Sequence, residues 1–296
     1  MLTIEPRPAA LELDGLTVGR ILPWVRRRMV GPFIFLDVMG PAELGPGHAM
    51  DVRPHPHIGL STVTYLFDGE IVHRDSLGCT QVIRPGEINW MTAGRGIAHS
   101  ERTPESARAH GTRLHGLQLW VALPKHEEER APTFDHFDRD ALPESTIGDA
   151  RVRLLAGTGW GLTSPVPALS PLVYAEVHVP AGALLPWPEE HPELGLYLVS
   201  GRFGEWTAGK MHVFDGERPE LRADGETHVM LIGGSGFPEK RYIWWNFVSS
   251  SRERIEQAKG EWMERKFPVV VGDEEEYVPL PADAWRQSPA TGAEHD

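Results

Sequence analysis

The chain has 296 residues, which is enough for about two domains of ordinary size. Its formal net charge is −13, from 29 basic and 42 acidic residues. This charge excludes a broad nucleic-acid surface, because phosphate binding needs clustered lysine and arginine, and the run Arg26-Arg27-Arg28 is too short to provide one.

The cysteine content and the hydrophobic runs exclude further classes of protein. Cys79 is the only cysteine, so neither an intrachain disulfide nor a thiolate zinc knuckle can form. No apolar run approaches the ~20 residues of a membrane helix. Residues 1–15 lack the basic start and apolar run of a signal peptide. We therefore expect a soluble, cytoplasmic protein without a membrane association.

Short runs rich in β-branched and aromatic residues, separated by glycine and proline, predict strands along the first half of the chain. Asp68-Gly69 is a strong hairpin signal, so we expect the strand before it to pair with the strand after it. Regular short strands indicate a β-sandwich or barrel. The predicted strands are residues 62–67, 70–74, 80–84, 88–92, 97–101 and 114–123.

Residues 124–144 are charged and contain prolines, and they predict an interdomain connection that can include one helical turn. Strands resume at residues 151–155, 172–179 and 194–199. The predicted organisation is an N-terminal domain, a linker and a C-terminal domain, with the bounds 1–130, 131–147 and 148–296.

An internal repeat supports two copies of one β-fold. Tyr197-Leu-Val-Ser-Gly201 aligns with Tyr65-Leu-Phe-Asp-Gly69 at a displacement of 132 positions. At the same displacement, His55 and His57 fall on Trp187 and Glu189. The second copy is therefore not expected to bind a metal in the same manner as the first.

The last ~50 residues predict one amphipathic helix. Ser250 and Glu253 have the spacing of a capping box. Ile255, Ala258 and Trp262 then lie on one helical face. The tail from Gln287 is predicted to be disordered.

Two pairs of metal-ligating residues stand out, His55-Pro-His57 and His99-Ser-Glu101. In a strand, residues i and i+2 point to the same face. Two neighbouring strands could therefore aim three imidazoles and one carboxylate into one pocket, a donor set that suits a transition metal and leaves room for a substrate. With 14 histidines in the chain, core or surface histidines explain such pairs equally well on spacing alone.

The residues around these pairs resemble the two-part cupin motif, and closely that of the pirin family. The resemblance is strong over about residues 20–125, and residues 242–251 are similar to the C-terminal part of some bacterial members. The matching stretches are His55-Pro-His57-Ile-Gly-Leu, Val72-His-Arg-Asp-Ser-Leu-Gly78, Gln81-Val-Ile-Arg-Pro-Gly86 and Asn89-Trp-Met-Thr-Ala-Gly-Arg-Gly-Ile-Ala-His-Ser-Glu101.

The resemblance implies an all-β bicupin, with two antiparallel β-barrel or jelly-roll domains face to face, a short C-terminal helix, and metal only in the first domain. By matching position, the implied ligands are His55, His57, His99 and Glu101. The implied cofactor is one mononuclear divalent transition metal, usually Fe(II), although Mn, Co, Ni, Cu or Zn also suit these donors. Ser61 stands where many members carry glutamate, so Glu101 is left as the obvious carboxylate.

The resemblance also implies two classes of function. One is a quercetin 2,3-dioxygenase-type enzyme that opens a flavonol-like substrate with O2, in which Glu101 takes the substrate proton. The alternative is a redox-dependent, metal-sensing regulator that acts through a protein partner. A small-molecule isomerase or another oxygenase on the same scaffold is a third option.

Several neighbouring residues could serve the site or simply the fold. Asn89 or Gln118 could orient a ligand histidine, with a structural role as the alternative. For the apolar residues the alternative to lining the pocket is the barrel core; they are Phe33, Phe35, Trp90 and Met91.

Overall fold

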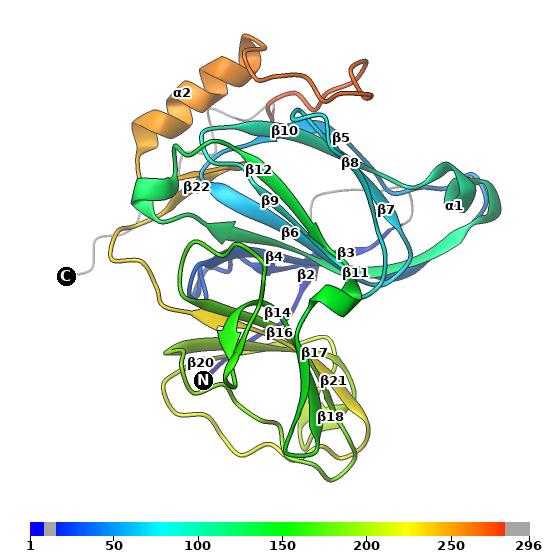
Figure 1. The fold of residues 1–296 in the computed structure, drawn as a ribbon, viewed down its shortest axis with the longest axis vertical. Coiled ribbons are helices and arrows are strands. Elements are labelled where there is room, and N and C mark those ends of the chain that lie inside the picture. The colour runs from blue at the N-terminus through cyan, green and yellow to red at the C-terminus, as the bar shows by residue number, and fades with distance from the viewer. Residues whose placement is uncertain (9–15, 282–296) are drawn as a thin grey trace.

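The structure is a computed structural model that describes residues 1–8 and 16–281. Two β domains lie one above the other, and a single longer helix covers the far end of the first (Figure 1). The all-β prediction is confirmed, since strands dominate the described chain.

Two sheets form the first domain. One has the strand order β12-β9-β6-β11-β4-β3-β2 and the other β5-β10-β7-β8. The strands and the short helix α1 span the following residues: β2 Arg7–Pro8, β3 Val18–Leu22, β4 Phe33–Leu44, β5 Asp51–His57, β6 Leu60–Asp68, β7 Ile71–Asp75, β8 Thr80–Ile83, β9 Ile88–Thr92, β10 Ile97–Arg102, α1 Glu105–His110, β11 Thr112–Ala122 and β12 Thr133–Phe137.

The second domain is built on one large sheet of order β1-β20-β17-β21-β16-β14-β13, with β15 paired to β14. A small hairpin, β18–β19, lies beside it. The bounds are β1 Leu2–Ile4, β13 Glu144–Ile147, β14 Ala150–Gly159, β15 Leu162–Thr163, β16 Leu172–Val179, β17 Glu193–Ser200, β18 Arg202–Phe203, β19 Trp206–Thr207, β20 Met211–Asp215 and β21 Thr227–Gly234. Two 3-10 turns, η1 Lys125–Glu127 and η2 Arg139–Ala141, lie in the predicted connection.

The large sheets of the two domains share one topology. The order β9-β6-β11-β4-β3 in the first corresponds to β20-β17-β21-β16-β14 in the second. Tyr65 lies on β6 and Tyr197 on β17, at the same place in the two orders. The internal repeat predicted from the sequence is therefore confirmed.

Each large sheet is completed by a strand from outside the main body of its domain. β1, at the N-terminus, pairs with β20 of the second domain. β12, inside the predicted connection, pairs with β9 of the first domain. The predicted boundaries at residues 130 and 147 stay a prediction, and the chain crosses between the domains on both sides of them.

The hairpin predicted at Asp68-Gly69 is wrong. β6 and β7 follow one another through this turn but belong to different sheets. β6 already pairs with β9 on one edge and β11 on the other, so it has no free edge for β7. The turn instead carries the chain from one sheet of the sandwich to the other.

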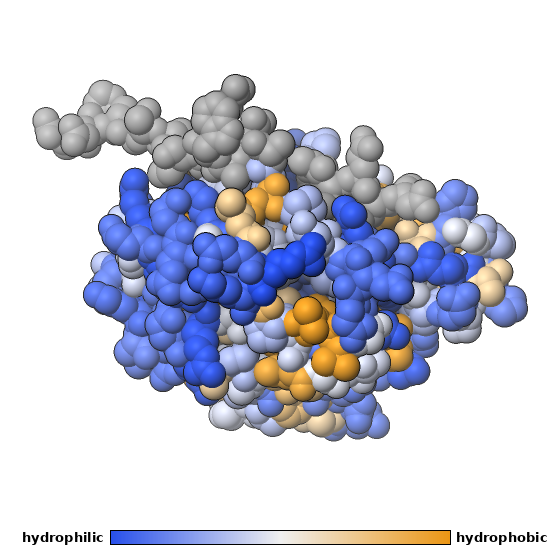
Figure 2. All heavy atoms as spheres, turned by 90° about the horizontal axis from the view of Figure 1, so that it is seen from above, coloured by the Kyte–Doolittle hydropathy of each residue, from blue (hydrophilic) through white to orange (hydrophobic). Residues whose placement is uncertain are grey.

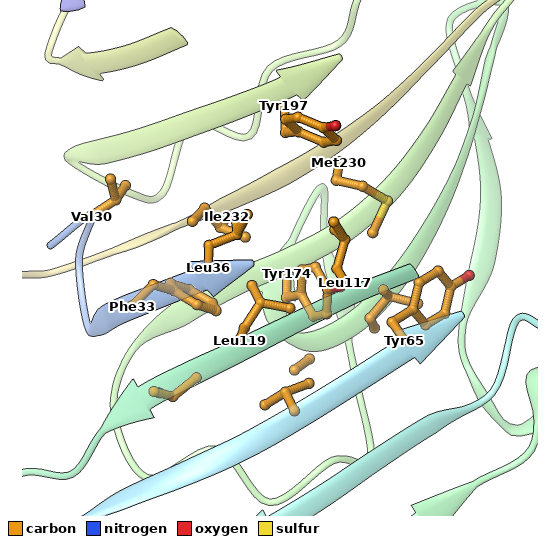
Figure 3. Packing of buried hydrophobic residues seen from close by; sticks show 14 of the residues in the cluster. Val30, Phe33, Leu36, Tyr65, Leu117, Leu119, Tyr174, Tyr197, Met230 and Ile232 are labelled. Atoms are coloured by element: carbon orange, nitrogen blue, oxygen red, sulfur yellow. The ribbon is translucent and has the colours of Figure 1, made fainter. Parts of the chain in front are cut away.

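The two domains share a continuous hydrophobic core. Figure 3 shows Tyr65, Leu117 and Leu119 of the first domain facing Tyr174 and Met230 of the second. Trp90 and Phe33 are fully buried in the same cluster, so these two belong to the core rather than to a pocket. The predicted face-to-face arrangement is confirmed.

The C-terminal segment returns to the first domain. It contains the hairpin β22 Tyr242–Trp244 and β23 Phe247–Ser249, followed by α2 Arg252–Met263. Phe247 forms a bridge to Ile58. The helical face predicted from the sequence is confirmed, since Ile255, Ala258 and Trp262 are buried in a cluster with Ile58 and Ala98 of the first domain.

The predicted capping residue is wrong by one position. Ser251 is the N-cap, and its hydroxyl accepts a hydrogen bond of 3.2 Å from the backbone N–H of Arg254. The Ser250 hydroxyl instead donates to Glu128. The local pattern favours Ser250 as the N-cap, but its hydroxyl is used in this hydrogen bond to Glu128 instead. The predicted disordered tail from Gln287 lies outside the described residues.

Gly59 connects β5 to β6 where the C-terminal segment packs closest. Its φ is +67°, and a Cβ there would lie 2.0 Å from the carbonyl oxygen of Val248. We expect Gly59→Ala to lower the free energy of unfolding by about 2–4 kcal/mol, since strain and overpacking add. Urea unfolding measures this. Gly148→Ala is the control: φ is +60° with open space around it, so only about 1 kcal/mol is expected. Equal losses would contradict the steric explanation.

No helix within residues 1–8 and 16–281 is long and apolar enough to cross a membrane. The face seen from the α2 end is mostly hydrophilic, with smaller hydrophobic groups between the charged ones (Figure 2).

Candidate metal centre

Two antiparallel strands, β5 and β10, bring the predicted histidines together. His55 lies opposite His99, and His57 lies opposite Ile97. Because side chains two residues apart share a face, all three imidazoles point into the space between the sheets. The ring centroids of His55 and His99 are 4.4 Å apart, and those of His57 and His99 are 5.0 Å apart. One ring nitrogen from each histidine lies within 4.8 Å of the others, so the three could hold a metal ion.

Burial keeps these rings neutral. His57 and His99 are each about 1% exposed, and burial lowers the pKa of both well below the usual value. Burial likewise lowers the pKa of His55 to about 4. A metal competes with protons for an imidazole nitrogen, so a histidine that stays neutral is prepared to act as a ligand.

The unpaired nitrogens of the three histidines fit a metal. Both ring nitrogens of His57 and the Nε2 atom of His99 are buried without a well-aligned hydrogen-bond partner among the described residues, and the backbone of Asn246 lies near the His57 ring. The Nδ1 atom of His55 donates to the carbonyl oxygen of Arg53 at 2.8 Å, which leaves its Nε2 lone pair available. Buried polar atoms without partners are costly, and a shared ion between the rings would satisfy them.

Glu101, the fourth predicted ligand, lies in the same pocket but outside the histidine group. Its side chain is buried, and its Oε1 atom accepts a hydrogen bond of 3.3 Å from the Thr64 hydroxyl on the facing sheet. Burial raises the pKa of Glu101 to about 7. The carboxyl group is thus placed to exchange a proton near neutral pH.

The sequence interpretation missed His73 on β7. His73 Nε2 lies 3.0 Å from a carboxylate oxygen of the fully buried Asp75, and His73 Nδ1 lies 3.4 Å from His99 Nδ1. If Asp75 accepts from Nε2–H of His73, then Nδ1 of His73 accepts from Nδ1–H of His99. The Nε2 lone pair of His99 is then free for a metal. The His73-x-Asp75 spacing within the matching stretch was the signal available in the sequence.

We expect His73→Ala to weaken metal binding by about 10–100-fold, because His99 loses the partner that fixes its tautomer. Isothermal titration with the divalent metal measures the affinity. His126→Ala, which changes an exposed histidine of η1, is the control and should leave the affinity unchanged. Wild-type affinity in the His73 variant would show that this hydrogen-bond chain does not orient His99.

Of the other residues predicted to lie near the histidines, some contact the site and others have only a structural role. The Trp120 ring contacts His57 edge to face at 5.2 Å between ring centroids and stacks on Phe35 at 4.0 Å, so Phe35 supports the pocket wall through Trp120. Gln118 contacts Thr64, which reaches Glu101. The Asn89 side chain instead accepts from His136, so it does not orient a pocket histidine.

The degenerate positions in the second domain carry no equivalent group. Trp187 donates its indole N–H to the carbonyl oxygen of Pro219. Glu189 belongs to none of the potential metal-binding groups of the described chain. The loss of the paired histidines in the second copy therefore removes this kind of pocket from it.

Comparison with known proteins connects these features to a family. The family model described as Pirin matches residues 16–121, and the one described as Pirin C-terminal cupin domain matches residues 174–268. A pirin-like protein of Caulobacter vibrioides is 49% identical over 278 residues, which cover 91% of this chain and 96% of that protein.

Relatives with a named activity are also similar over most of their length. A Pseudomonas aeruginosa protein, provisionally named a quercetin 2,3-dioxygenase, is 41% identical over 84% of this chain and 80% of its own. The solved structure of quercetin 2,3-dioxygenase from Acinetobacter baumannii aligns with a TM-score of 0.85 and 33% identity, covering 95% of this chain and 94% of that one. The two-domain cupin fold predicted from the sequence is confirmed.

Proposed function

The chain belongs to the pirin family, and on that premise we propose that it is a metal-dependent oxygenase of the quercetin 2,3-dioxygenase type. Its substrates would be a flavonol-like aromatic compound and O2. The observation that carries the proposal is the group of three neutral, buried histidines with unpaired nitrogens. The relatives named as quercetin 2,3-dioxygenases support the substrate class.

We propose His55, His57 and His99 as metal ligands and Glu101 as a fourth ligand or a proton acceptor. Fe(II) is the proposed metal, and Mn, Co, Ni, Cu or Zn would also suit the donors. When bound, the metal would supply Lewis-acid polarisation of the flavonol hydroxyl and a site for O2. One mononuclear centre would lie in the first domain, and the proposed location of the protein is the cytoplasm.

The other roles in the reaction, which are proton acceptance, positioning and substrate contact, would fall to side chains of the pocket. Glu101, with a pKa of about 7, would accept the proton of the flavonol hydroxyl, because a base near the working pH is most effective. Thr64 and Gln118 would hold the carboxylate on its side of the pocket. The ring of Trp120 offers an apolar surface beside His57 for an aromatic substrate.

The C-terminal segment would exclude water from this chemistry. Phe247 and Val248 are fully buried against Ile58 and Leu60, which flank the turn that follows His57. A dry pocket strengthens the electrostatic interactions within it. The segment would therefore keep the reacting groups apart from bulk solvent.

Anaerobic loading with Fe(II), followed by quercetin and air, tests the proposal. Loss of the flavonol absorption band with uptake of O2 is expected. Absence of turnover with each of Fe, Mn, Co, Ni and Cu would contradict it. The alternative, a redox-dependent regulator acting through a protein partner, then predicts different partners for the reduced and oxidised protein.

A further inference from the structure

A second group of potential metal ligands lies in the C-terminal domain, where the first pocket has no counterpart. It consists of Glu176, His178 and His228, whose ligand atoms all lie within 4.8 Å of one another. We propose that these three residues bind a divalent transition ion of the zinc type, at the rim of the interface between the two domains.

Strand register explains why the three side chains meet. β16 and β21 are antiparallel neighbours, and His178 lies directly opposite His228. Glu176 precedes His178 by two residues, so it shares the same face of the sheet. This is the placement that β5 and β10 give to His55, His57 and His99 in the first domain. It arises in the second domain on a different pair of strands.

Distances within the group fit tetrahedral coordination. The Oε1 atom of Glu176 lies 3.0 Å from Nε2 of His228 and 3.6 Å from Nε2 of His178. With bonds of about 2.0–2.1 Å, ligand atoms around a tetrahedral zinc ion are about 3.3–3.4 Å apart. The two distances from Glu176 lie on either side of this value, so rotation of one imidazole ring and a small shift of the carboxylate would bring all three donors into the coordination sphere.

Hydrogen bonds to one oxygen of the Glu176 carboxylate fix the orientation of the other. Its Oε2 atom accepts hydrogen bonds from the Tyr65 hydroxyl at 2.9 Å and from Nη1 of Arg153 at 3.1 Å. Its Oε1 atom faces the two histidines. Hydrogen bonds that orient a ligating carboxylate are a regular part of metal sites. Oε1 is thus left for the ion.

His228 is in contact with both other members of the group. Its Nε2 atom is buried and lies 3.0 Å from Glu176 Oε1, the acceptor that an ion would share with it. The rings of His178 and His228 stack at 4.3 Å between centroids with an interplanar angle of 12°. Because the nitrogen lone pairs of parallel rings do not converge, one of the two rings would rotate to bind an ion together with the other.

Charge and access also suit a cation. Arg153 is paired with both Glu176 and Glu144, so the formal charge of these three groups is −1. The His178 side chain is 37% exposed, while that of His228 is 15% exposed. The site would be open on one side, which leaves a coordination position for water or for a residue of another molecule.

Occupancy would affect the contact between the domains. Tyr65, whose hydroxyl donates a hydrogen bond to Glu176, belongs to β6 of the first domain and to the shared core (Figure 3). Phe67, also on β6, packs edge to face on His228 at 5.1 Å. A bound ion would hold Glu176 and His228 against these two aromatic side chains. The ion is therefore expected to raise the thermal midpoint of the full chain.

Zinc titration of the full-length protein tests the proposal separately from the first pocket. In the His55→Ala/His57→Ala background, calorimetry with Zn2+ should show one ion per chain and an increase of the thermal midpoint. Addition of His178→Ala/His228→Ala should weaken this binding by at least about 100-fold, because two of three protein ligands are lost. His126→Ala, at a side chain 79% exposed in the first domain, should leave it unchanged.

Two outcomes would overturn the proposal: no Zn2+ binding in the first background, or unchanged binding after both histidines of the second site are replaced. If the combined variant does not fold, the single variant His178→Gln decides, because it alters a half-exposed side chain. Unchanged Zn2+ affinity in that variant would overturn the site. Failure here would leave the quercetin assay unaffected, since that assay depends on the first pocket.

Discussion

Replacement of His57 by alanine is expected to abolish stoichiometric metal binding in the first domain and to reduce any oxygenase activity more than about 100-fold. Of the three histidines, His57 has the fewest hydrogen bonds, since neither ring nitrogen has a well-aligned partner among the described residues. Metal analysis after loading with one equivalent of Fe(II) measures the effect. The His178→Ala/His228→Ala background removes the other proposed site from the count.

The stability of the metal-free protein should change less than its activity. His57 buries ring nitrogens without a well-aligned partner, and each unsatisfied group costs about 1–3 kcal/mol. His57→Ala removes this cost but leaves a cavity, which by itself costs about 2–5 kcal/mol, so we expect the unfolding midpoint of the metal-free variant to fall only slightly. Added metal should raise the midpoint of the wild type only. Full metal occupancy in both His57→Ala and Glu101→Ala would show that the proposed ligand set is wrong.

Loss of the Glu128 carboxylate is expected to lower the free energy of unfolding by about 3 kcal/mol, since it leaves the buried Arg241 with only the more distant and half-exposed carboxylate of Glu239 at 3.6 Å. Glu128 follows η1 and pairs with Arg241 at 3.1 Å, and the side chains of the two are 6% and 0% exposed. Its oxygens also accept from the hydroxyls of Ser249 and Ser250. One residue thus fixes both ends of the hairpin β22–β23 to the first domain.

The neighbouring residue provides a matched control for Glu128→Ala. Glu129 forms an ion pair of 2.9 Å with Arg254, but its side chain is 60% exposed. Glu129→Ala should therefore cost only about 0–1 kcal/mol. Urea unfolding measures both variants, and limited proteolysis should cut Glu128→Ala within residues 242–251. Losses that agree within 1 kcal/mol would contradict the role given to the buried pair. The double variant Glu128→Leu/Arg241→Met should recover much of the loss.

The local sequence pattern was sufficient to predict many of the strands. Residues 88–92 and 172–179 are strands with the predicted bounds, because alternation and β-branched content act within the segment itself. The partner of each strand could not be predicted in the same way. Asp68-Gly69 specifies a tight turn, but whether β7 pairs with β6 depends on β9 and β11, which come later in the chain.

For the site, too, local spacing predicted some features, while others depend on residues far apart in the sequence. The pairs His55-x-His57 and His99-x-Glu101 predict a shared pocket because the two-residue period of a strand fixes their direction. Trp120 and the C-terminal segment approach from the facing sheet and from residues far along the chain, so spacing could not reveal them. Glu176-x-His178 has the same two-residue spacing as the first pair, but its partner His228 is 50 positions away and is identified only by the register of β16 with β21.

The return of residues 241–281 to the first domain has a consequence for the order of events during synthesis. The ribosome releases the histidine strands β5 and β10 well before Arg241, Phe247 and α2 have been made. The pocket is therefore built early but covered late, when the chain is nearly complete and Glu128 receives its partner. Domains generally fold as they emerge, so the side of the nascent first domain near His57 would stay open to an ion until the hairpin β22–β23 has been made. Closure of the C-terminal segment would then retain it.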